Sequence, residues 1–115
     1  MARKANTRSA TPVYNAADDY VIADRGSESA NLALGDGGGA VDDFLARVTV
    51  TTTPATSALN IYDGDPAGSG VLLLAIPAST AVGTSYELGV RSKVGGFYMQ
   101  DDANNGAVIA VGDFT

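Results

Sequence analysis

The chain has 115 residues, of which 45% are hydrophobic and 17% are charged, and this balance predicts one compact domain with a modest core. It contains no Cys and no His, which excludes disulfides, thiolate or imidazole metal sites, Cys or His nucleophiles and the Ser-His-Asp triad. The sequence still allows catalysis by carboxylate pairs, Lys or Tyr, and it allows Ca²⁺ or Mg²⁺ sites with oxygen ligands.

The N-terminal segment MARKANTRSATPVYNAADD is polar and small, and we expect residues 1–19 to form a basic, extended arm in front of a single domain over residues 20–115. Removing its cations Arg3, Lys4 and Arg8 from the net charge of −6 leaves −9 on the remainder. One interpretation of the arm is a loose terminus. The other is an arm that docks on a neighbouring subunit or lattice, with three apolar anchors: Pro12, Val13 and Tyr14.

Charge and hydropathy also limit the partners. An acidic body repels phosphate, so we expect no nucleic-acid binding by the folded part. The longest purely apolar run, residues 71–78, is too short to span a bilayer, and the basic N-terminus is not followed by an apolar signal core. We therefore expect no membrane partner.

Strand-length segments begin at Tyr20 with YVIAD, and a brief strand is expected at residues 31–34. In DDFLARVTVTTTP, apolar residues fit a helical face, yet Phe44, Ala46, Val48 and Val50 also alternate with a second set of residues. That second set is Leu45, Arg47, Thr49 and Thr51. The β-branched run that follows favours a strand, which Pro54 ends.

The second half of the chain contains five more strand candidates, each bounded by turn-forming residues. VLLLAIP does not alternate, so we expect it to be covered on both faces, in the middle of the core or at a subunit contact. In SYELGVRS, larger apolar residues alternate with charged or small ones, which predicts a strand with one solvent-exposed face. Asn105-Gly106 predicts a hairpin between the last two strands. The candidates are ALNIYD, VLLLAIP, SYELGVRS, GGFYMQD and AVIAVGDF, and the proposed subunit contact consists of Val71, Leu72, Leu73 and Leu74.

Together these segments predict an all-β fold, an antiparallel β-sandwich (jelly-roll-like) or small barrel of about seven or eight strands. The scarcity of helical stretches between strands argues against a parallel α/β sheet.

Two acidic loops are the candidate cation sites. Asp63-Gly64-Asp65 begins like a Ca²⁺ loop, but Ala67 supplies no side-chain oxygen and Leu74 stands where a bidentate Glu is needed. A turn explains it better. In QDDANNG, turn chemistry again accounts for the composition. The sequence therefore predicts no metal and no cofactor, and the acids closest to a site are Asp63, Asp65, Asp101 and Asp102.

No catalytic residues emerge from the remaining motifs. GDGGGA lacks the Lys and Ser/Thr of a phosphate-binding loop. Asp42 and Asp43 are an acid pair without a visible partner, so we expect no enzyme activity. Tyr62 and Tyr98 are the aromatic residues that a glycan-binding surface would use, although aromatic residues on strands commonly serve sheet packing.

A resemblance is carried by LNIYDGDPAGSGVLLLAIP, YELGVRSKVGGFYMQ and GAVIAVGDF, which cover about residues 57–114. These segments resemble the small all-β virion proteins of tailed bacteriophages. In that group a strand ending in Tyr-Asp-Gly leads through a Gly-containing turn to a Val-Leu strand, then to a Leu-Gly-x-Arg strand and a Gly-x-Tyr strand.

The resemblance implies a capsid decoration or cement protein. Such a protein binds the major capsid protein on the outer surface of the head shell, commonly as a homotrimer, and stabilises the shell. It would be made in the host cytoplasm and located on the virion. The alternatives are a head fibre or receptor/glycan-binding domain, and a head-to-tail connector component.

Overall fold

The computed structural model describes residues 19–24, 31–35, 37–102 and 105–115. These residues form eight strands. Among them, no helix is long and apolar enough to cross a membrane. In chain order the strands are β1 (Asp19–Asp24), β2 (Leu32–Ala33), β3 (Phe44–Thr52), β4 (Leu59–Asp63), β5 (Val71–Ile76), β6 (Ser85–Arg91), β7 (Phe97–Gln100) and β8 (Ala107–Asp113).

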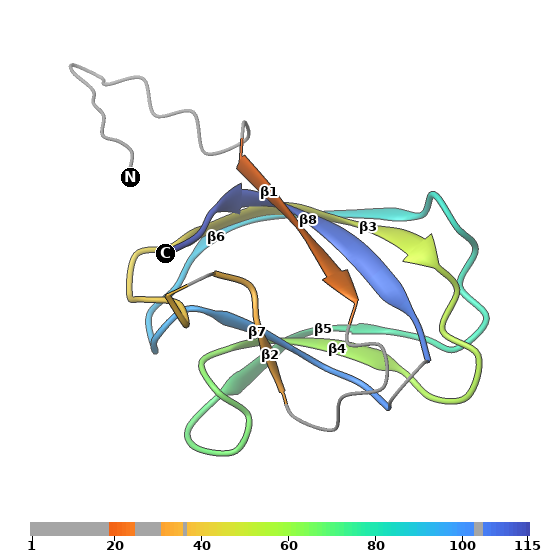
Figure 1. The fold of residues 1–115 in the computed structure, drawn as a ribbon, viewed down its shortest axis with the longest axis horizontal. Coiled ribbons are helices and arrows are strands. Elements are labelled where there is room, and N and C mark those ends of the chain that lie inside the picture. The colour runs from red at the N-terminus through yellow and green to blue at the C-terminus, as the bar shows by residue number, and fades with distance from the viewer. Residues whose placement is uncertain (1–18, 25–30, 36, 103–104) are drawn as a thin grey trace.

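The strands form two four-stranded antiparallel sheets that face each other (Figure 1). One sheet has the order β1-β8-β3-β6 and the other has the order β2-β7-β4-β5. Strand pairs therefore nest as first with eighth, second with seventh, third with sixth and fourth with fifth. This nesting is the strand order of a jelly roll, and it confirms the predicted all-β sandwich.

The core lies between the sheets and consists of side chains from both inner faces. Alternation explains which residues enter it, because successive residues of a strand point to opposite faces. In β4, for example, Leu59 and Ile61 are fully buried while Asn60 and Tyr62 are half-buried on the outer face. The core residues are Ala23, Leu34, Leu45, Val48, Val50, Leu59, Ile61, Ile76, Phe97, Met99, Val108 and Ala110.

The alternation predicted for β3 is wrong over its first half. Leu45 and Val48 are both fully buried, whereas Phe44 and Ala46 are only half-buried. The cause is a register shift between Leu45 and Arg47, present against both neighbouring strands. A β-bulge places one extra residue in a strand and so exchanges the two faces beyond it.

Candidate functional site

The Asp63-Gly64-Asp65 segment is a hairpin connection, as predicted. It joins β4 to β5, which pair in antiparallel register, and Gly64 has a φ of 88°. Asp65 is exposed, and its Oδ1 accepts hydrogen bonds from the backbone N–H of Ala67 at 2.9 Å and from Asn31 Nδ2 at 3.1 Å. The first of these bonds is an Asx turn, the local bond that favours Asp in such loops.

Asp63 differs from Asp65 because it is buried, with 6% of its surface exposed. Its Oδ1 accepts from Ser92 Oγ at 2.7 Å and from the Val94 N–H at 3.3 Å, and its Oδ2 accepts from the Lys93 N–H at 2.8 Å. Ser92 Oγ in turn accepts from the Gly96 N–H at 2.6 Å. The carboxylate therefore binds the loop between β6 and β7 and fixes its conformation.

The second acidic loop is not a hairpin, and the prediction from Asn105-Gly106 is wrong. β7 and β8 belong to different sheets, so the connection between these two strands joins the two layers of the sandwich. Asn105 is 3% exposed, and its Oδ1 accepts from the backbone N–H groups of Ala55 and Thr56, both at 2.7 Å. The next residue is Gly106, and a Cβ at this position would lie only 3.1 Å from Pro54 Cα.

Hydrogen bonds also engage the two acids of this loop. Asp101 Oδ1 accepts from Asn105 Nδ2 at 2.6 Å and from the Asp102 N–H at 2.8 Å. Asp102 Oδ2 accepts from Ser57 Oγ at 2.8 Å. Across the described part of the chain, no three acidic side chains gather into a group that could hold a metal ion.

Asp42 and Asp43 do not form an acid pair that acts on a common atom. Asp42 is exposed with a φ of 76°, and its N–H donates to Ser92 O at 2.9 Å. Asp43 is buried, and its carboxylate accepts from Thr115 Oγ1 at 2.6 Å and from the Thr115 N–H at 3.1 Å. Sequence reasoning missed this contact because 72 positions separate its partners.

We expect Thr115→Ala to lower the free energy of unfolding by about 1 kcal/mol, because it removes one hydrogen bond to a buried carboxylate. Equilibrium denaturation in urea measures the change. Thr115→Ser keeps the hydroxyl and serves as the control. Equal losses in both variants would mean that the hydroxyl contributes nothing.

Tyr62 and Tyr98 are direct cross-strand neighbours on the outer face of the second sheet. The Tyr62 hydroxyl donates to Gln100 Oε1 at 3.1 Å, and the Tyr98 hydroxyl donates to Gly38 O at 2.9 Å. Both side chains are half-buried. A cross-strand aromatic pair stabilises a sheet, and it is also the surface that the glycan-binding alternative would use.

The apolar run VLLLAI forms β5, which lies at the edge of its sheet and not in the middle of the core. Val71, Leu72 and Leu73 are 53%, 51% and 36% exposed, whereas Leu74 is half-buried against the core. Ile76 is fully buried, so the run is covered in part, but coverage on both faces, the sequence prediction, does not occur within this chain. The second option, a subunit contact at these four residues, stays a prediction.

A slot of about 260 Å³ lies between β5 and β6. Both are edge strands, one from each sheet, so the sandwich is open along this side. The slot has apolar walls with two cations beside them. It is lined by Val71, Leu73, Val90, Val94, Asp63, Arg91 and Lys93.

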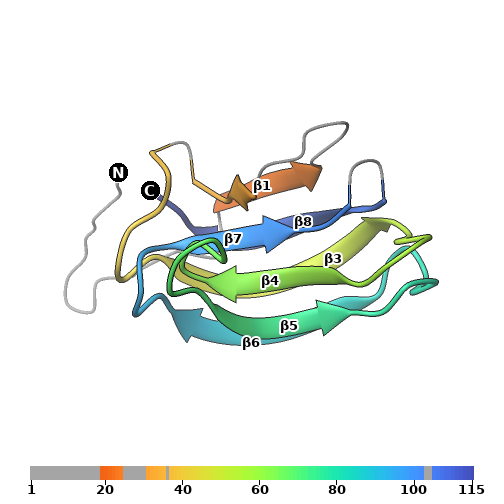
Figure 2. The same ribbon diagram turned by 90° about the horizontal axis from the view of Figure 1, so that it is seen from below.

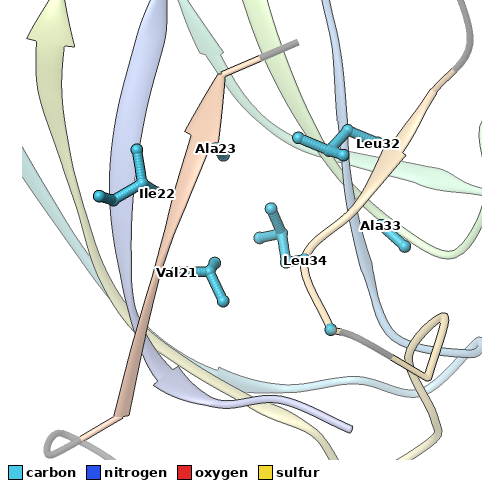
Figure 3. A pocket seen from close by; sticks show the side chains of 7 residues that line it. Val21, Ile22, Ala23, Leu32, Ala33 and Leu34 are labelled. Carbon is cyan, nitrogen blue, oxygen red and sulfur yellow. The ribbon is translucent and has the colours of Figure 1, made fainter.

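A second pocket, of about 180 Å³, lies on the opposite side of the sandwich between the edge strands β1 and β2. Figure 3 shows Val21 and Leu34 directed into it, while Ile22 points to the other side of β1. Ile22 is 67% exposed and Tyr20 is 61% exposed. The side chains lining this pocket are apolar, and none of them offers a charge or a nucleophile.

The predicted arm, including Arg3, Lys4, Arg8, Pro12, Val13 and Tyr14, lies outside the described residues except for Asp19, which begins β1. The candidate surfaces of the folded part are therefore the two open sides of the sandwich and the tyrosine pair. Comparison of the chain with protein-family models, curated proteins and solved structures gives no match.

Proposed function

We propose that the protein is a virion structural protein that binds the outer surface of a bacteriophage head shell and stabilises it. The observation that carries the proposal is the exposed apolar β5 beside the slot, because an unpaired strand edge with apolar side chains is a surface for another protein. The likeness of residues 57–114 to small phage virion proteins supplies the assignment to the head.

The buried polar side chains form hydrogen bonds within the chain, which is consistent with a binding role for the protein. Asp63, Asp43 and Asn105 are buried, and each hydrogen-bonds to loops of this chain. Such bonds rigidify a scaffold. A decoration protein needs a rigid scaffold and many copies of a small interface, since repeated weak contacts add up over a shell. Jelly rolls occur in viral capsid and lectin domains, and the fold alone does not choose between them.

Residues 1–19 are the proposed capsid-docking arm. Three cations open the arm, and the body over residues 20–115, with 11 acidic and 4 basic residues, carries −7, so the arm is suited to an acidic protein surface on the shell. The three apolar residues, Pro12, Val13 and Tyr14, would anchor it there. The proposed partner is the major capsid protein, and the proposed assembly is a homotrimer.

We expect deletion of residues 2–14 to reduce occupancy on purified head shells at least about tenfold, which is the loss of about 1.4 kcal/mol of binding free energy. Co-sedimentation with shells measures occupancy, and a thermal melt of the isolated variant checks that it folds. An Arg3→Ala, Lys4→Ala, Arg8→Ala variant of full length separates the charge from the apolar anchors.

Sedimentation of a native lysate tests the assignment itself. Hundreds of copies migrating with DNA-filled heads would support decoration, whereas about a dozen per particle would indicate a connector or fibre, since symmetry fixes copy number. Recovery in the soluble fraction alone would overturn the virion proposal. Unchanged occupancy of the deletion variant would overturn only the role of the arm.

A further inference from the structure

Exposed apolar side chains gather on two opposite sides of the sandwich. Of the eight large apolar residues that are exposed in the described chain, six lie on an edge strand or line the slot. Figure 2 shows β1 along one side and β5 with β6 along the other. Tyr20 and Ile22 belong to the β1/β2 side, and Val71, Leu72, Leu73 and Val94 belong to the β5/β6 side.

The two sides also differ in their balance of charges. The cations of the described residues are Arg47 on β3, Arg91 on β6 and Lys93 just after it. β6 also carries Glu87, which pairs with Arg47 at 3.8 Å, and the buried Asp63 lines the slot. Within the same residues, no Lys or Arg lies on β1, β2, β7 or β8, while β1 ends at Asp24 and β8 ends at Asp113. The β5/β6 side therefore carries Arg91 and Lys93 in addition to one paired and one buried acid, whereas the described residues of β1 and β2 include acids and no cation.

The strand directions of the two edges fit each other as well. Each sheet has four antiparallel strands, so its two edge strands run in opposite directions. A second copy placed beside the first in the same orientation would bring its β1 antiparallel to β6 of the first, and its β2 antiparallel to β5. Unpaired edges of this kind add strands from another chain through backbone hydrogen bonds.

We propose that copies of this chain associate head to tail, with the β1/β2 side of one copy against the β5/β6 side of the next. The β1/β2 pocket of one copy, with Val21, would then face the slot of its neighbour, with Val90. The apolar core would in this way continue from one copy into the next. Arg91 and Lys93 would face the acidic side of that neighbour, which favours this pairing and steers association.

The alternative occupant of the slot is the same side of a second copy, related by a twofold axis. That arrangement would place Arg91 and Lys93 of both copies close together, and like charges across an interface are unfavourable. A head-to-tail contact leaves one free surface of each kind at its ends. It therefore closes into a ring, such as a trimer, or continues as an open chain.

The test uses the purified full-length chain without shells, so that its failure is separate from failure of the virion proposal. Ile22→Lys disturbs the β1/β2 side alone, and Val71→Asp disturbs the β5/β6 side alone. Val82→Lys and Val82→Asp are matched controls in the loop between β5 and β6. All three positions are more than half exposed, at 67%, 53% and 63%, so each variant is expected to fold.

Sedimentation velocity over a concentration series gives the result. We expect the unmodified chain and both Val82 variants to form the same oligomer. Val71→Asp should raise the concentration at half association at least about tenfold, because a charge enters the apolar slot. Ile22→Lys should do the same, because it places a cation on the edge that receives Arg91 and Lys93 of the neighbouring copy. An equimolar mixture of the two should form a dimer and stop there, since one intact contact remains.

Three results would overturn the proposal. The first is an unmodified chain that stays monomeric up to about 1 mM, the weak end of the affinity scale. The second is loss of association in Val71→Asp but not in Ile22→Lys, which would indicate the twofold arrangement. The third is a mixture of the two variants that remains monomeric.

Discussion

Gly96→Ala is expected to lower the free energy of unfolding by at least about 3 kcal/mol, because the added methyl group meets backbone atoms at a residue with positive φ. Gly96 has a φ of 93°, and a Cβ there would lie 2.5 Å from Gly39 Cα and 2.9 Å from the Ala40 nitrogen. These neighbours are backbone atoms, so no side-chain rotation relieves the overlap. The loop before β7 would have to separate from the segment before β3.

Gly83→Ala provides the matched control for this substitution. Gly83 has a φ of 92°, almost the same conformation, but nothing lies within 4 Å of the position of a Cβ. Its loss is expected to be about 1 kcal/mol, the conformational cost of a left-handed residue alone. Urea denaturation of both variants measures the difference. Equal losses would contradict a close Gly39–Gly96 approach.

The strands themselves were predictable, because local pattern determines them. Alternation in SYELGVRS and the turn residues between segments indicate strands, and the structure has β6 there with its outer residues exposed. The position of a strand within a sheet is a different property. The segment VLLLAI does not show whether its strand lies at the edge or in the centre of a sheet. An edge strand that binds another protein and a buried central strand are both apolar.

The incorrect predictions have a common cause in long-range packing. Asn-Gly tolerates the positive φ of a tight hairpin, but here Asn105 makes its hydrogen bonds to residues 55–57, and these bonds hold a crossing between the sheets. The bulge in β3 likewise appears as two buried residues three positions apart, a spacing that a helix also produces. Sequence spacing alone does not separate these cases.

The hydrogen bonds of the buried polar residues were even harder to predict from the sequence. Ser92 is 1% exposed, and its hydroxyl joins Asp63 to the backbone of Gly96 in the loop between β6 and β7, yet a serine in a loop does not stand out in the sequence. In the sequence, Asp63 stands out only as an acidic residue and hence as a possible cation ligand. Its role emerges only from the three donors that folding brings to it, 29 to 31 positions away.

Asp63→Asn is therefore expected to lower the free energy of unfolding by about 2 to 3 kcal/mol, although it preserves the shape of the side chain. Both oxygens of Asp63 accept hydrogen bonds. The side chain of asparagine has one acceptor oxygen and one NH₂ group. Its NH₂ group would therefore face either the Lys93 N–H or the donors from Ser92 and Val94. The substitution leaves a buried donor opposed to another donor, so at least one of them loses its hydrogen bond.

Asp65→Asn, two residues further along the same turn, is the control. Asp65 is exposed and uses only Oδ1 as an acceptor, for the Ala67 N–H and Asn31 Nδ2. Asparagine retains that oxygen, so we expect a loss below about 0.5 kcal/mol, as for most surface substitutions. Guanidinium denaturation of both variants gives the comparison. Similar losses at the two positions would mean that the turn chemistry, and not the buried carboxylate, stabilises this corner of the fold and with it the wall of the β5/β6 slot.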